Sequence, residues 1–160
     1  MNTPIESHPP TARLEHLLQM LRQRGCRLTP QRSAILRAVL TSEEHPTAEQ
    51  IYAQVRAEFP MTSLATVYNT LGLLKEMGAV LEIGLGNTST RFDGVRPEPH
   101  PHLICTQCNT IFDADLPELQ YLGEAVSRAT GFQVKSHRFD FFGICPQCQK
   151  RGYNITTKKT

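Results

Sequence analysis

The sequence has no long apolar run and no apolar leader. No segment of its 160 residues approaches the about 20 consecutive apolar residues that a membrane-spanning helix needs. The first residues, MNTPIESHPPTARLEH, lack the apolar core of a secretory signal. We therefore expect a cytoplasmic chain, and in that compartment closely spaced cysteines favour metal binding over disulfide bonds.

Neither sign of charge dominates. Lys and Arg number 17 and Asp and Glu number 15, so the formal net charge is only +2. Any surface that binds nucleic acid must then be local rather than spread over the whole molecule. The hydrophobic share of 39% and the charged share of 20% are ordinary for a globular protein, so composition does not favour disorder. The length suits one domain or two small ones.

Four of the five cysteines form two Cys-x-x-Cys pairs, Cys105 with Cys108 and Cys145 with Cys148. The two-residue spacer lets both sulfurs of a tight turn reach one ion, and four thiolates suit a closed tetrahedral zinc site. We expect these four residues to bind a structural zinc ion. The alternatives are a pair of reactive dithiols, as in a zinc-ribbon redox protein, or free buried thiols.

A second group of candidate ligands contains only histidine and aspartate: His45, Asp93, His100, His102 and Asp113. The alternating His100-Pro-His102 places both rings on one side of an extended strand. Imidazole nitrogens and carboxylate oxygens suit Mn²⁺, Fe²⁺ or Zn²⁺ and leave the ion more exchangeable than thiolates do. Taken singly, His45 and Asp93 could equally be a loop residue and a turn former. We expect these five residues to form a second, more exchangeable metal site, whose ion could report on the cell.

The first half of the chain predicts helices followed by a hairpin. Apolar spacing and capping residues predict four helices: residues 11–24, one opened by Thr29-Pro30, one opened by the capping box Thr47–Gln50, and one that begins near Thr62 or Ser63 and ends at Gly78. Two short strands around a Gly/Asn turn follow, up to Asp93. This order is typical of a winged helix-turn-helix, so we expect a DNA-binding domain over residues 1–93.

The fourth helix carries polar residues away from its Leu/Val stripe, and they suit base and phosphate contacts at a helix N-terminus: Ser63, Thr66, Tyr68 and Asn69. Arginines in flanking segments are the expected phosphate contacts: Arg27, Arg32 and Arg91. The alternative is that these are ordinary solvated positions.

The second half predicts a small α/β unit over residues 100–150, after a hinge at 94–99 and before a tail at 151–160. Strands are expected at 102–105, 110–113, 132–134 and 138–143, with a helix opened by Pro117 and ended by Gly131. A unit of about 50 residues needs a metal to stabilise it. Its apolar helix face and strand edges suggest a homodimer. The fold class is therefore α+β.

Four sequence segments together resemble the ferric uptake regulator (Fur) superfamily over about residues 11–150: Arg27-Leu-Thr-Pro-Gln-Arg32, His45-Pro-Thr-Ala, Thr66-Val-Tyr-Asn-Thr-Leu71 and His100-Pro-His-Leu-Ile-Cys-Thr-Gln-Cys108. Within it the chain is most similar to the peroxide-responsive (PerR-type) repressors. The resemblance implies that three histidines and two aspartates, at the positions of the second group, hold the sensing metal. Iron sensors typically have glutamate at the positions of Asp93 and Asp113, and many have arginine at the position of Asn69.

The resemblance implies a dimeric, metal-dependent repressor that binds a double-stranded, palindromic operator. It would sense peroxide through iron-catalysed oxidation of a ligand histidine. That is a stoichiometric self-modification, so we do not expect an enzyme. A reversible iron, manganese or zinc uptake regulator of the same fold is the main alternative. The further metal site of several iron sensors is not expected, because Pro99, Pro101 and Gln120 occupy its positions and leave only His137.

Overall fold

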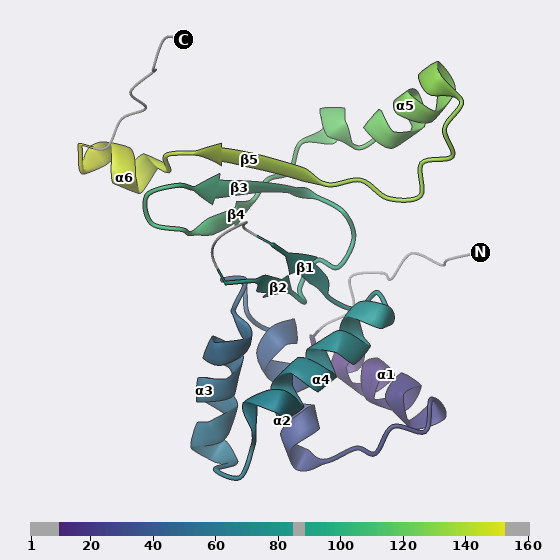
Figure 1. Ribbon diagram of the computed structural model, residues 1–160, viewed down its shortest axis with the longest axis vertical. Coiled ribbons are helices and arrows are strands. Elements are labelled where there is room, and N and C mark those ends of the chain that lie inside the picture. Colours follow the sequence, from purple (N-terminus) through teal and green to yellow (C-terminus); the bar gives the residue numbers. More distant parts are fainter. Residues whose placement is uncertain (1–9, 85–88, 153–160) are drawn as a thin grey trace. The chain divides into compact units, whose positions relative to one another are not determined.

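The computed structural model describes residues 10–84 and 89–152. They form two compact units, one extending to Pro97 and the other starting at Glu98. The first consists of helices and a hairpin, and the second is a small sheet with short helices (Figure 1). Among the described residues, no helix has the length and apolar character needed to span a bilayer.

Four helices build the N-terminal unit: α1 (Pro10–Gln23), α2 (Pro30–Leu40), α3 (Ala48–Glu58) and α4 (Leu64–Glu76). Three of them begin where a side chain caps free backbone N–H groups. Thr29 accepts from the N–H of Arg32, and Ser63 accepts from that of Thr66. Thr47 and Gln50 form the complete capping box expected from the sequence. The predicted start of each of these helices is confirmed.

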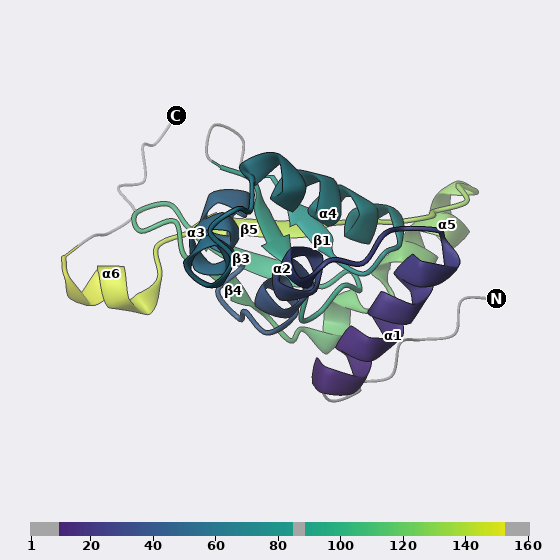
Figure 2. The ribbon, with the colours of Figure 1, turned by 90° about the horizontal axis from the view of Figure 1, so that it is seen from below.

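Helix α2 is the centre of this unit and packs against α1, α3 and α4 (Figure 2). Its inward face includes Ile35, Leu36 and Val39, none of which is measurably exposed. Val67 and Leu74 of α4 are equally buried. The apolar stripes therefore meet around α2, which leaves the polar side of α4 at the surface.

A two-stranded antiparallel hairpin, β1 (Leu81–Ile83) and β2 (Arg91–Asp93), completes the unit, with Leu81 opposite Asp93. The expected Gly/Asn turn at Gly86 and Asn87 lies outside the described residues. Strand β2 also contacts the segment before α3, because the N–H of Phe92 donates to the carbonyl of Pro46 at 3.0 Å. The end of β2 is thereby fixed beside the loop that precedes α3.

The C-terminal unit contains a three-stranded sheet in the order β4-β3-β5. Strand β3 (Pro101–Cys105) is central, with β4 (Ile111–Asp113) antiparallel on one side and β5 (Phe139–Gly143) parallel on the other. The register places Asp113, His102 and Asp140 in one row across the sheet. The next row, on the opposite face, contains Phe112, Leu103 and Phe141. One row is polar and the other is apolar.

Two predictions for this unit are wrong in detail, and one helix was not predicted. The helix expected from Pro117 is a 3₁₀ turn, Pro117–Leu119, followed by a shorter α5 (Leu122–Thr130), and no side chain caps α5 at Tyr121. Residues 132–134 form no strand, because strand pairing on that side of β3 starts only at Phe139. The helix α6 (Pro146–Lys150), which Cys145 caps, was not predicted from the sequence.

Large apolar side chains remain exposed in the C-terminal unit. Phe132, Tyr121 and Phe142 are 74%, 62% and 61% exposed. Leu122 and Val126, on one face of α5, are also exposed. Such a surface on a small unit is typical of a face that another chain covers.

Candidate metal sites and nucleic-acid surface

The four paired cysteines converge at one end of the C-terminal sheet. Cys105 ends β3 and Cys108 lies in the turn that follows it, whereas Cys145 caps α6 and Cys148 lies within that helix. The four sulfurs lie within 4.8 Å of one another, and the sulfurs of Cys108 and Cys145 are 3.8 Å apart. Two tight turns from distant parts of the sequence thus present four thiols to one point, as a tetrahedral ion requires.

The ionisation of these thiols explains why the cluster suits a cation. Burial opposes the ionisation of Cys105, but backbone N–H groups of Cys145, Cys108 and Gln107 lower its pKa to about 6. Burial and the neighbouring sulfurs instead raise the pKa of Cys148 to about 12. Ionisation is thus favoured at Cys105 and opposed at Cys148. A divalent cation removes that opposition, because it attracts all four sulfurs at once.

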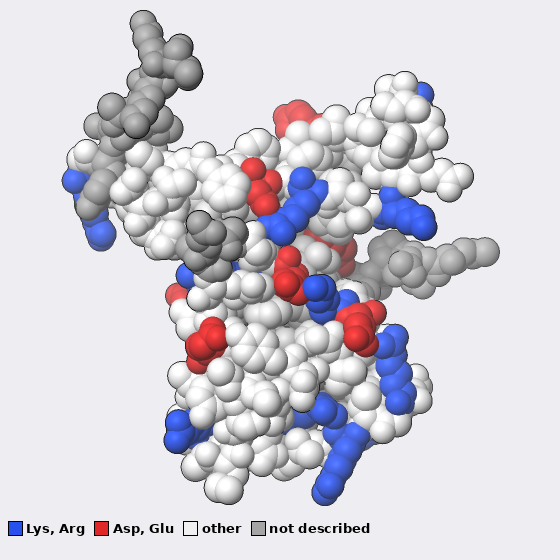
Figure 3. Space-filling model, in the orientation of Figure 1, with Lys and Arg blue, Asp and Glu red and all other residues white. Residues whose placement is uncertain are grey.

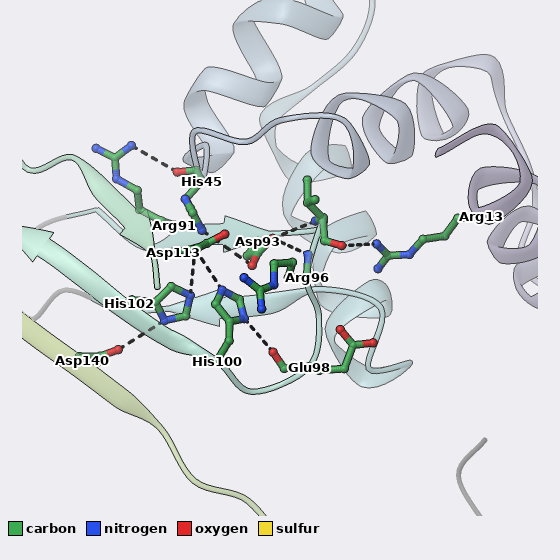
Figure 4. Close-up of polar contacts among 11 residues, drawn as sticks. Arg13, His45, Arg91, Asp93, Arg96, Glu98, His100, His102, Asp113 and Asp140 are labelled. Atoms are coloured by element: carbon green, nitrogen blue, oxygen red, sulfur yellow. Dashed lines mark hydrogen bonds and ion pairs between the residues drawn. The ribbon is translucent and has the colours of Figure 1, made fainter. Parts of the chain in front are cut away.

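His45 and Asp93 form a first half-site within the N-terminal unit (Figure 4). The ring Nε2 of His45 lies 3.7 Å from Oδ2 of Asp93, and each residue is 2% exposed. The other carboxylate oxygen of Asp93 accepts from the N–H groups of Val95 and Arg96, at 2.8 and 3.0 Å. Those two bonds fix the carboxylate so that Oδ2 lies on the side of His45.

The backbone at His45 has an unusual conformation, with φ of 49° before a proline. A non-glycine residue in this region costs on the order of 1–3 kcal/mol, and such strain is found mainly at functional sites. Arg91 supports the loop by donating to the carbonyl of His45 at 3.3 Å. The structure thus holds the His45 ring in place at a cost in backbone energy.

His100, His102 and Asp113 form a second half-site, within the C-terminal unit (Figure 4). Oδ1 of Asp113 lies 3.0 Å from Nε2 of His100 and 4.0 Å from Nε2 of His102. The two ring centroids are 4.4 Å apart. His102 and Asp113 are direct partners on β3 and β4, and His100 precedes β3.

The tautomer of His100 follows from the partner of its Nδ1 atom. Nδ1 lies 2.9 Å from the carbonyl of Glu98, and because a carbonyl can only accept, Nδ1 carries the proton. In the neutral ring Nε2 is then an acceptor that faces a carboxylate oxygen. Two acceptors at 3.0 Å need a proton or a shared cation between them. This donor set fits a divalent ion with nitrogen and oxygen ligands.

The polar residues predicted for DNA contact lie at the start of α4, where they already make local contacts. The Ser63 hydroxyl caps the helix and lies 2.8 Å from the Thr66 hydroxyl. The Tyr68 hydroxyl donates to Glu49 at 2.7 Å, and this contact raises the pKa of Tyr68 and lowers that of Glu49. Asn69 is exposed. Tyr68 is 47% exposed and stays protonated, so both side chains can reach a partner.

The three predicted phosphate contacts differ in their surroundings. Arg27 is exposed. Arg32 donates to the carbonyl of Arg27 at 2.6 Å and so supports the segment that carries it. Arg91 contacts the His45 loop instead. In Figure 3 the lower part of the helical unit, where α2 and α4 begin, shows mainly Lys and Arg among its charged groups. Basic groups beside two helix N-termini suit phosphate binding.

Two groups beside the second half-site were not predicted from the sequence. The Glu98 carbonyl lies beside Nδ1 of His100, and the Asp140 carboxylate lies beside Nδ1 of His102. Asp140 lies in the predicted strand 138–143, but nothing in the sequence indicated that this strand pairs with β3.

Comparisons with known proteins agree on the family. The family model described as "Ferric uptake regulator family" matches residues 23–142. The peroxide-responsive repressor PerR of Staphylococcus aureus is 42% identical over 138 residues, covering 86% of this chain and 93% of that protein.

Two solved structures resemble most of this chain. The peroxide stress regulator of Campylobacter jejuni has a TM-score of 0.67 and 35% identity, and the match covers 82% of this chain and 98% of that one. A zinc-bound manganese uptake regulator has a TM-score of 0.62 and 32% identity over the same shares. With its winged-helix order of elements, its four-cysteine cluster and these matches, the chain belongs to the ferric uptake regulator family.

Proposed function

We propose that this protein is a dimeric, metal-dependent transcriptional repressor that senses peroxide. The observation that carries the proposal is its 42% identity to a peroxide-responsive repressor, together with two aspartates, Asp93 and Asp113, among the five candidate ligands. The exposed apolar side chains of the C-terminal unit support a homodimer built through that unit. The family consists of regulators, and we propose that this chain likewise acts by binding rather than as an enzyme.

The cysteine cluster has the structural role in this proposal. Zinc at Cys105, Cys108, Cys145 and Cys148 joins the end of β3 to the start of α6. The C-terminal unit buries few large apolar residues, mainly Ile104 and Ile111. Metal binding of this kind contributes on the order of 10 kcal/mol to folding. Zinc therefore supplies stability that the small core lacks.

The two half-sites have the regulatory role. We propose that one Fe²⁺ or Mn²⁺ ion is held jointly by the pair in the N-terminal unit and the three ligands in the C-terminal unit. An ion with ligands from both units favours one angle between them, and with it one spacing of the two α4 helices in a dimer. The residues between Asp93 and His100 then act as the hinge. Successive major grooves of a palindromic operator require a defined spacing.

Peroxide sensing then depends on the histidine rings. Iron(II), when bound, supplies the electron that converts peroxide into a strong oxidant within the site. His45 and His100 hold their rings in fixed positions there, His45 through its strained backbone and His100 through the Glu98 carbonyl. One oxygen of peroxide enters a ring C–H bond and the other leaves as water, and the oxidised ring loses basicity at nitrogen and binds metal poorly. The two half-sites then separate and the operator is released.

The deciding experiment compares iron-loaded with manganese-loaded protein. Iron-loaded dimer exposed to low peroxide is expected to lose operator binding in a gel-shift assay. Mass spectrometry should then find one added oxygen on a peptide containing His45 or His100. Manganese-loaded dimer should change in neither respect, because Mn²⁺ does not readily transfer an electron to peroxide.

The main competing function predicts a different outcome. The manganese uptake regulator is 32% identical, so a reversible sensor of metal abundance has support of its own. In that case iron-loaded protein keeps its mass and its operator affinity after peroxide. Affinity would instead follow the free metal concentration alone, and the peroxide-sensing proposal would fail.

A further inference from the structure

His102 is the central member of a row of three side chains that crosses the C-terminal sheet. Asp113 is its partner on β4 and Asp140 is its partner on β5, in direct register on either side. Paired residues at one level of a sheet project from the same face. The His102 ring is therefore placed between two carboxylates.

The two carboxylates face different nitrogens of the ring. Asp113 lies on the side of Nε2, at 4.0 Å, and Asp140 lies on the side of Nδ1, with 3.6 Å between Nδ1 and Oδ1 (Figure 4). The His102 side chain is 3% exposed and that of Asp140 is 18% exposed. Water has little access to Nδ1, so Asp140 is the group placed to accept a hydrogen bond from Nδ1–H.

Asp140 is itself fixed by a neighbour. The Arg138 guanidinium forms an ion pair with the second carboxylate oxygen, Oδ2, at 2.6 Å. With Oδ2 occupied, Oδ1 remains on the side of the ring. Side-chain contacts thus connect the surface to the candidate metal site, from Arg138 through Asp140 to His102.

We propose that Asp140 is the positioning residue of His102. It accepts a hydrogen bond from Nδ1–H and favours the tautomer in which Nε2 carries no proton. It thereby raises the affinity of Nε2 for a metal ion. The present separation of 3.6 Å exceeds a hydrogen bond of about 2.9 Å. A small rotation of the ring would bring Nδ1 within hydrogen-bond distance of Oδ1. A carboxylate that accepts from a ligating imidazole makes the ring a stronger electron donor and raises metal affinity. This inference rests on the proposed regulatory site.

The second histidine of the pair makes a useful comparison. His100 is oriented by the neutral carbonyl of Glu98, whereas His102 is oriented by a charged carboxylate. A charged acceptor polarises its partner ring more strongly than a carbonyl does. His102 is accordingly the stronger donor of the two, and Asp140 sets that difference.

The test is a cobalt(II) titration of dimer that already contains zinc in the cysteine cluster. Asp140→Ala is expected to weaken cobalt binding at the second site by about 10- to 100-fold and to shift its visible d–d bands. Asp140→Glu should recover part of the affinity. Asp115→Ala is the matched control, because it removes the same charge from an exposed position in the same unit, and should leave affinity and spectrum unchanged.

A purely structural role for Asp140 is tested in the same samples. Zinc content and dimer mass should stay at wild-type values in Asp140→Ala. If that variant does not fold, Asp140→Asn keeps the shape and removes the charge, and roughly tenfold weaker binding is expected. Long-range ¹⁵N NMR of protein with zinc in both sites should place the His102 proton on Nδ1 in the wild type and show a shifted Nδ1 resonance in the variant.

Three results would overturn the inference. Wild-type affinity and spectrum in the folded Asp140 variants would show that the carboxylate does not act on the ring. Equal weakening by Asp115→Ala would show a general effect of charge. A wild-type protein that binds no cobalt beyond the cysteine cluster would remove the proposed regulatory site itself, and the role of Asp140 with it.

Discussion

Asp113 is a short carboxylate that lies against two histidine rings, at 3.0 Å from one and 4.0 Å from the other. Asp113→Glu adds one methylene and moves the carboxylate toward the ion. We expect this variant to keep metal binding and operator binding but to respond less to peroxide, because the longer side chain fills the space that peroxide would enter. Operator release against peroxide concentration, with mass spectrometry of the histidine peptides, measures the effect. An unchanged response would exclude this role of side-chain length.

Gly94, next to Asp93, has no room for a side chain. A Cβ at this position would lie 2.5 Å from the Val39 carbonyl oxygen of α2. Gly94→Ala is therefore expected to destabilise the N-terminal unit by roughly 1–3 kcal/mol, since helix backbone cannot give way easily. The matched control is Gly72→Ala, where nothing lies within 4 Å. It should stabilise α4 by about 1 kcal/mol. Urea unfolding monitored by helix ellipticity distinguishes the two, and equal effects would contradict the expected steric clash.

The chemistry of single residues was predictable where a short motif carries it. The Cys-x-x-Cys spacing alone predicted a cluster of four thiols, and the sulfurs do converge. The alternation of His100 and His102 predicted a shared ligand face. Asp140 was not predicted, because its role depends on the parallel pairing of β5 with β3, and such long-range pairing leaves no local sequence pattern.

Among the elements, the helices with local caps were predicted best. Thr29, Thr47 and Ser63 each fix a helix start through bonds that span only three residues. The segment after Pro117 was predicted poorly for the opposite reason. Its apolar spacing is continuous, but its chain turns at Gln120 and Tyr121 and no side chain there caps the helix. The spacing of apolar residues does not reveal such a break.

Helix α4 is the element on which DNA binding should depend. Tyr68→Ala removes an exposed aromatic group from the helix, and Arg27→Ala removes an exposed charge near the start of α2. Both are expected to weaken operator binding, and Arg27→Ala should lower the slope of log K against log salt by about 1. Fluorescence anisotropy at several salt concentrations measures both quantities. Arg128→Ala, in α5, is the control of equal charge. Unchanged affinity in Tyr68→Ala and Arg27→Ala would mean that DNA binds elsewhere.

For the molecule as a whole, the cysteine cluster should decide whether the dimer exists. Cys105→Ser or Cys145→Ser is expected to release zinc, unfold the C-terminal unit and abolish dimers, because the small apolar core cannot hold the sheet alone. Size-exclusion chromatography with zinc analysis gives both readouts. Cys26→Ser is the control, since Cys26 packs against the core of the N-terminal unit instead. A zinc-free Cys105→Ser dimer that remains folded would remove the structural role of the metal.

The distance along the chain between the two cysteine pairs also fixes an order of events during synthesis. The N–H of Cys145 reaches the sulfur of Cys105 across 40 residues, and β5 joins β3 only when residues 139–143 have left the ribosome. The helical unit ends at Pro97 and is compact by itself, so it can fold while the rest is still being made. A nascent chain therefore has α4, the helix proposed to read the operator, before it has a complete cysteine cluster or a second histidine half-site. On the proposed function, newly made protein becomes competent to respond to metal only as α6, the last helix of the described residues, emerges.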